Sequence, residues 1–108
     1  MNDLYIMESL ATLGKITQGQ KLSFSLGKFQ IVDKPIGIFR WMSGDGKHVT
    51  VSYIKQVVDN AILKNIPFDE NILKGIENLK ITYHKNMSTF LELTRIQLDV
   101  KNELSRRS

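Results

Sequence analysis

Few residues in this chain are placed to carry out chemistry. His48 and His84 are its only histidines, and its 108 residues include no cysteine. A zinc site would therefore need both histidines together with carboxylates, and their spacing matches no zinc-binding motif. The lack of cysteine also excludes a disulfide framework and a thiolate nucleophile. We expect no metal and no cofactor.

The glycine-rich turn at residues 43–47, Ser-Gly-Asp-Gly-Lys, invites comparison with a phosphate-binding loop. Such a loop requires a glycine at the position of Trp41 and a serine or threonine at the position of His48. A calcium loop is excluded as well, because Asp45 stands alone where several oxygen donors at alternate positions are needed. The composition is that of a connecting turn.

No motif in the chain indicates an enzyme. Ser43, Asp45 and His48 have the residue types of a hydrolase triad, but they crowd one turn without a nucleophile elbow or an oxyanion element. Carboxylates that act as acid and base must be brought together in a cleft. The acidic residues of the last third instead fall on helix faces that we expect to be solvated: Glu77, Glu92, Asp99 and Glu103.

Positive charge is spread along the chain. The formal net charge is +4, with 15 Lys and Arg interleaved with 11 Asp and Glu. A nucleic-acid interface needs its basic residues concentrated on one face. The best candidates for such contacts lie in the last third of the chain: Lys80, Lys85, Arg95, Arg106 and Arg107. Nucleic-acid binding is therefore kept as an alternative function.

The element that must position these residues is the last third of the chain. From residue 67 to about residue 104, side chains of a main seam recur at spacings of four and three, a heptad pattern typical of one long helix. Such a helix would be roughly 50 Å long, so it is expected to protrude or to oligomerise. Gly75 is its weak point and indicates close packing or a bend. The main seam comprises Ile72, Ile76, Leu79, Tyr83, Asn86, Phe90, Leu93, Gln97, Val100 and Leu104.

A second stripe runs beside the main seam through Met87, Leu91, Thr94 and Leu98. A helix apolar over so much of its circumference is normally covered from two sides. Either another protein chain covers one stripe, or the helices predicted below at 3–16 and 51–65 cover both. The polar members of the main seam resemble those that fix register and partner number in coiled coils. We predict an interface made of Asn86, Met87, Phe90, Leu91, Thr94, Gln97 and Leu98.

The first third of the chain predicts a helix followed by a hairpin. Apolar residues at helical spacing indicate an amphipathic helix over 3–16. From residue 21 to 33 the apolar period changes to two, which indicates two strands. A two-residue loop at 27–28 would place Leu26 opposite Phe29 and Phe24 opposite Ile31, with the large side chains on one face. That face is expected to pack on a helix, because a lone two-stranded ribbon is marginal in water.

The middle of the chain is ambiguous. Residues 36–42 fit either a strand or a short helical segment, and Phe39 and Trp41 within them are expected to fill the core. After the turn at 43–47, helical spacing predicts a helix over about 51–65, with Thr50 as its N-cap. The competing interpretation is a second hairpin, which pairs 36–42 with 48–53 and extends the sheet to four strands.

Length and composition complete the prediction. A chain of this size with 42% apolar residues forms one domain with one core. The N-terminus lacks the basic region of a signal peptide and no apolar run could span a membrane, so we expect a cytoplasmic protein. The predicted fold class is α+β, with an N-terminal helix, a hairpin and two C-terminal helices. The predicted function is a non-enzymatic adaptor, accessory factor or assembly component, which binds a protein partner or its own copy through the last helix.

Overall fold

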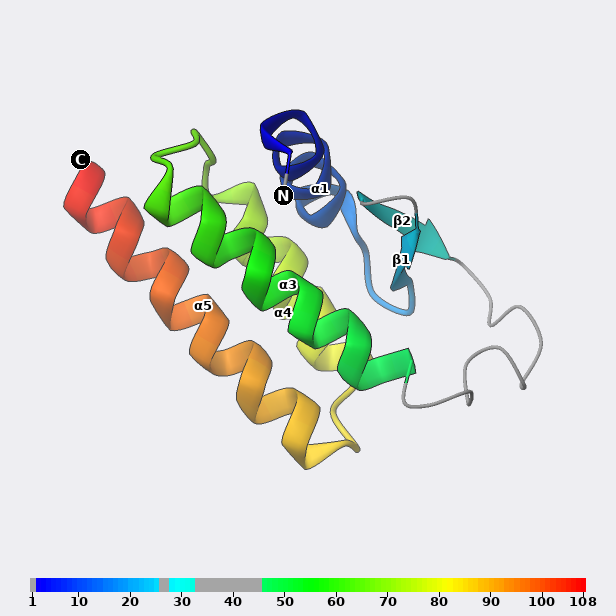
Figure 1. The fold of residues 1–108 in the computed structure, drawn as a ribbon. Helices are drawn as coiled ribbons and strands as arrows, with labels where there is room; N and C mark the ends of the chain where they lie inside the picture. The colour runs from blue at the N-terminus through cyan, green and yellow to red at the C-terminus, as the bar shows by residue number, and fades with distance from the viewer. Residues whose placement is uncertain (1, 26–27, 33–45) are drawn as a thin grey trace.

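The computed structural model describes residues 2–25, 28–32 and 46–108 (Figure 1). It confirms an α+β fold that is mostly helical, with one small sheet and a long last helix. The elements in chain order are α1 (Asp3–Lys15), β1 (Lys21–Ser25), β2 (Lys28–Val32), α3 (Gly46–Leu63), α4 (Asn71–Thr82) and α5 (Met87–Arg107).

The helices form the body of the molecule. In Figure 1, α3 and α5 run side by side with α4 behind them, while α1 and the hairpin lie on the side away from α5. Helix α5 packs against both α3 and α4, and α4 also packs against α1. One hydrophobic core joins these layers, with Ile6, Leu22, Ile54, Ile76 and Leu93 among its fully buried side chains.

The prediction of a single helix over 67–104 is wrong. The chain leaves the helical path after Thr82 and begins α5 at Met87. At the junction Asn86 has an extended backbone, and its side chain accepts a hydrogen bond from the Thr89 amide at 3.1 Å. This is the geometry of an N-cap, so Asn86 starts a new helix rather than occupying a coiled-coil seam. The two helices then fold back on each other and bury their apolar faces within the chain.

The hairpin is confirmed, but its predicted register is wrong. The structure pairs Leu22 with Ile31, Phe24 with Phe29 and Ser25 with Lys28. The pairing differs by two residues from the prediction. Because side chains alternate with a period of two, both registers place the same residues on one face, and alternation alone could not choose between them.

Helix α3 resolves the ambiguity of residues 48–53. It begins at Gly46, so Thr50 lies inside the helix and is not its N-cap, and 48–53 cannot form a strand. The four-stranded alternative is therefore wrong, and the sheet of the described residues has two strands. The ambiguous segment 36–42, including Phe39 and Trp41, lies outside the described residues, as do residues 43–45 of the predicted turn.

The connection from α3 to α4 is built on a left-handed residue. Asn65 has a φ of 56°, and the amides of Asn65 and Ile66 donate to the carbonyls of Ile62 and Ala61 at 3.2 and 2.8 Å. These two bonds form the Schellman motif, which satisfies carbonyl groups that the end of α3 would otherwise leave free. The chain therefore reverses sharply between α3 and α4.

Gly75 marks a close approach of two helices, as its position inside a helical pattern indicated. A Cβ atom at this position would lie 1.8 Å from the carbonyl oxygen of Leu13 in α1. The same side of α4 also holds the chain that follows α1: the Asn78 amide donates to the Ile16 carbonyl at 2.9 Å, and the Gly19 amide donates to the Thr82 hydroxyl at 2.9 Å. Gly75, Asn78 and Thr82 thus fix α1 against α4.

We expect Gly75→Ala to destabilise the fold by about 3 kcal/mol, because the added methyl group overlaps backbone that can move only if the two helices separate. Urea denaturation measures the change in the free energy of unfolding. Gly14→Ala is the matched control, since its methyl group would lie 3.3 Å from the Asn71 Cβ atom and 3.6 Å or more from the Asn71 backbone. Equal stability of the two variants would contradict the close approach.

Candidate protein interface on the last helix

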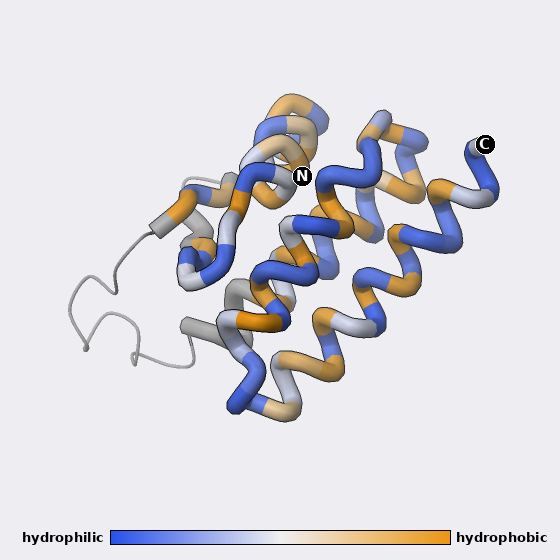
Figure 2. The backbone as a smooth tube through the Cα atoms, turned by 180° about the vertical axis from the view of Figure 1, so that it is seen from behind, coloured by the Kyte–Doolittle hydropathy of each residue, from blue (hydrophilic) through white to orange (hydrophobic). Residues whose placement is uncertain are grey.

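Helix α5 has two apolar faces. The first is buried between α3 and α4 and includes Leu93, Ile96 and Val100. The second faces solvent: Met87 is 67% exposed, Leu91 53% and Leu98 57%. Figure 2 shows hydrophobic and hydrophilic residues alternating along α5 to the end marked C. The main seam is therefore used within the chain, and no described residue covers the outward side chains, here called the outward stripe: Met87, Leu91 and Leu98.

The seven residues of the predicted interface divide between these two directions. Besides the outward stripe, Thr94 is half-buried, and its hydroxyl donates to the Phe90 carbonyl at 2.9 Å. The other three, Asn86, Phe90 and Gln97, make contacts within the chain. Asn86 caps α5, and the ammonium group of Lys80 in α4 lies 4.9 Å above the Phe90 ring.

Gln97 is buried in a polar cluster between α4 and α5. Its amide nitrogen donates to the Glu77 carboxylate at 3.1 Å and to the Leu73 carbonyl at 3.4 Å. Its amide oxygen accepts a hydrogen bond from Lys80 at 3.1 Å. Both ends of the side chain are therefore satisfied, so burial of this amide leaves no unpaired polar group. Gln97 fixes α5 against α4 and does not need a second chain to pair its amide.

The basic residues of the nucleic-acid alternative do not share one free face. Lys80 belongs to the Gln97 cluster, and Arg106 and Arg107 both bind the carboxylate of Glu103. Lys85 and Arg95 are exposed, the first in the connection before α5 and the second on α5 itself. Three of the five candidates are thus engaged within the chain.

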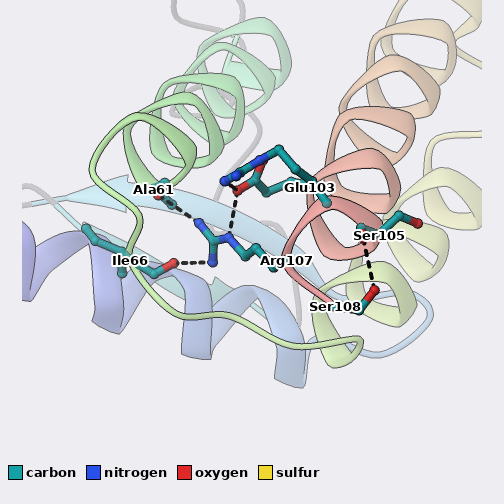
Figure 3. Close-up of polar contacts among 7 residues, drawn as sticks. Ala61, Ile66, Glu103, Ser105, Arg107 and Ser108 are labelled. Atoms are coloured by element: carbon teal, nitrogen blue, oxygen red, sulfur yellow. Dashed lines mark hydrogen bonds and ion pairs between the residues drawn. The ribbon is translucent and has the colours of Figure 1, made fainter.

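The end of α5 is clasped to the α3–α4 connection (Figure 3). Arg107 donates to the carbonyls of Ile66 and Ala61 at 2.8 and 3.3 Å and to Glu103 at 2.6 Å. Its guanidinium also lies 4.5 Å from the centre of the Phe68 ring. One arginine therefore joins α5 to the Ala61 carbonyl, which also accepts a bond of the Schellman turn, and to the Ile66 carbonyl that follows the turn. The planar guanidinium suits such a pair of acceptors.

Glu103 was expected on a solvated face, and this prediction is wrong, because its side chain is only 5% exposed. Hydrogen bonds from Arg106 and Arg107 favour the ionised carboxylate and lower the pKa of Glu103 from 4.5 to about 2. Helical spacing could have revealed the pair, since arginines three and four residues after a glutamate share its face. Its burial, and the contact of its partner Arg107 with the Ile66 and Ala61 carbonyls, were not revealed by the helical pattern.

A groove of about 540 Å³ runs between α3 and α5 beside the outward stripe. Its apolar part includes Val51, Ile96 and the stripe residue Leu98, and its polar rim includes Glu92 and Arg95. The groove and the stripe therefore form one continuous surface on α5, apolar at its centre and charged at its edge.

The described residues offer little else for chemistry. Among them, no group of three or more His, Asp or Glu side chains could hold a metal ion. The exposed His84 places its Nδ1 atom 2.8 Å from the Ile81 carbonyl oxygen, a local contact next to the end of α4. Within the same residues, no helix is both long and apolar enough to cross a membrane.

Comparisons of the chain with protein-family models, with characterised proteins and with solved structures find no match.

We expect Leu91→Glu and Leu98→Glu to change the free energy of unfolding by no more than about 0.5 kcal/mol, because both side chains already face water. Leu93→Glu is the matched control on the same helix: Leu93 is fully buried, so a carboxylate there should unfold the protein. Circular dichroism during urea titration compares the three. Unfolding of the Leu91 and Leu98 variants would show that these side chains belong to the core.

We also expect the clasp to weaken in acid. Since the pKa of Glu103 is lowered in the folded state, the unfolded state binds more protons between pH 4.5 and about 2. The contribution of Glu103 is therefore complete above pH 4.5 and is lost as the pH falls through about 2. Thermal unfolding should show Glu103→Gln less stable than wild type at neutral pH, with the difference shrinking over this window. Glu92→Gln, at an exposed position, is the control; a constant difference for Glu103→Gln would contradict the lowered pKa.

Proposed function

We propose that this protein is a non-enzymatic protein–protein interaction module, an adaptor, accessory factor or assembly component that binds through α5. The observation that carries the proposal is the outward stripe. Three large apolar side chains lie along one side of a helix whose opposite side is already buried in the core. The fold does not use them, so their exposure is explained best by a partner that covers them.

The surroundings of the stripe have the character of an interaction site. Apolar patches rimmed by polar residues mark protein interaction surfaces more often than random exposure does. Here the rim includes Glu92 and Arg95, and the groove between α3 and α5 adds a concave region next to Leu98. Burial of such a patch contributes roughly 25 cal/mol per Å² of apolar surface before the costs of association.

The position of α5 also supports the proposal, because the helix is fixed before any partner binds. The Asn86 cap holds its beginning, Gln97 ties its middle to α4, and Arg107 clasps its end to the α3–α4 connection. A surface on a rigid element loses little conformational entropy on association. The stripe can therefore bind in the arrangement that the free protein already has.

Nucleic-acid binding has weaker support, because Lys80, Arg106 and Arg107 make contacts within the chain. It would be revealed by association with DNA or RNA that weakens steeply as salt is added. The variants that separate the two functions are Leu91→Glu, which should abolish protein binding, and Lys85→Ala, at an exposed base outside the outward stripe and its rim, which should reduce nucleic-acid binding at low salt.

A photo-cross-linking residue placed at position 91 should capture a discrete protein species in cells that produce the protein. The same residue at position 63 is the control, since Leu63 is an equally apolar side chain, 83% exposed, at the end of α3 and away from the stripe. The adduct at 91 should disappear when Leu98→Glu is added to the chain. No adduct at 91, or the same adducts from both positions, would refute the proposed function.

A further inference from the structure

We infer that the outward stripe binds a second copy of this chain, with α5 packed antiparallel against α5 of that copy. This inference rests on the proposed function and names the partner. The stripe and the charged side chains beside it on α5 supply the reason.

The charges beside the stripe cancel. Glu92 and Asp99 are exposed acids on α5, and Arg95 and Lys101 are exposed bases on the same helix. Their sum is zero, whereas the whole chain carries a net charge of +4, which therefore resides on the remaining surface. Two copies that approach each other by their basic faces repel each other on average. Two copies that approach by the neutral face with the stripe do not have this repulsion between the contacting surfaces. A neutral apolar stripe on a basic protein is suited to pairing with itself.

The order of the side chains favours the antiparallel arrangement. In a parallel pair, each charged residue lies at the level of the same residue of the second copy, and Glu92 is about 4.5 Å along the helix from Arg95 of that copy. In an antiparallel pair centred between Thr94 and Arg95, Leu91 lies opposite Leu98 of the second copy. The two Arg95 side chains then lie near the two-fold axis, and each is about 3 Å along the helix from Glu92 of the other copy, so two carboxylates compensate the two guanidinium groups. Opposed helix dipoles add to the preference.

The centre of the stripe can be buried without leaving a polar group unpaired. Thr94 lies between Leu91 and Leu98, and its hydroxyl already donates to the Phe90 carbonyl. Its small side chain lets the two helices approach closely at the axis. The groove beside Leu98 provides room for the Leu91 side chain of the second copy. The covered patch is small, so we expect a dissociation constant on the order of 10 to 100 µM.

Sedimentation equilibrium at concentrations up to several hundred micromolar tests the pairing. Wild type should show a monomer–dimer equilibrium, and Leu91→Glu and Leu98→Glu should remain folded monomers. Arg95→Glu should weaken the dimer roughly tenfold, and the double variant Glu92→Arg/Arg95→Glu should restore it. A dimer unchanged by both leucine variants would place the contact on another face and overturn the inference, as would failure of the double variant to restore it.

Disulfide trapping tests the orientation, because the natural chain has no cysteine. Equal amounts of Leu91→Cys and Leu98→Cys, mixed and oxidised, should give mainly the mixed dimer that joins position 91 to position 98. Predominance of 91–91 and 98–98 dimers would show a parallel pair and overturn the antiparallel contact. If wild type is monomeric while photo-cross-linking at 91 captures a different protein, the second copy is refuted and the proposed function stands. If neither disulfide trapping nor photo-cross-linking gives a contact at position 91, the pairing with a second copy and the proposed function are both refuted.

Discussion

The packing of α4 against α1 at Gly75 is the constraint on which the rest of the fold depends. The Leu13 carbonyl occupies the place where any other residue at position 75 would have a side chain. Because one side of α4 is bound so closely to α1, its other apolar side remains for α5. Helix α4 is thus the shared middle layer, and the chain must turn back after Thr82 for α5 to reach it. A helix continued without a break could not cover α4 and would leave its own main seam exposed.

This constraint explains which parts of the fold the sequence could predict. The N-terminal helix, the hairpin and an apolar α5 follow from local periodicity, which each segment carries in itself. The division between α4 and α5 does not follow from local periodicity. Tyr83 and Asn86 continue the spacing of four and three across the turn, and no proline or glycine marks the break. The break is marked only by the cap that Asn86 forms with the Thr89 amide. From the sequence alone, an asparagine that caps a new helix cannot be distinguished from an asparagine inside a continuous helical seam.

The candidate site was predictable to a similar extent. The second stripe is a property of one helix, so its members Met87, Leu91 and Leu98 could be found from spacing, and the structure leaves them exposed. The contacts of Gln97 depend on groups from α4, the Glu77 carboxylate and the Leu73 carbonyl. Glu103 binds Arg107, whose guanidinium in turn reaches the Ile66 and Ala61 carbonyls. Such partners are far away in the sequence, and no period in α5 specifies them.

The same contacts that the sequence could not specify give the stripe its value as a binding surface. A small apolar patch offers limited free energy on association, and ordering a flexible segment would consume much of it. Gln97 and the bonds from Arg107 to the Ile66 and Ala61 carbonyls hold the 21 residues of α5 in place, so the helix is ordered during folding and not on association. The inward face of α5 fixes the helix, and the outward face is left free to bind. The proposed binding would therefore depend on three exposed side chains that lie outside the core.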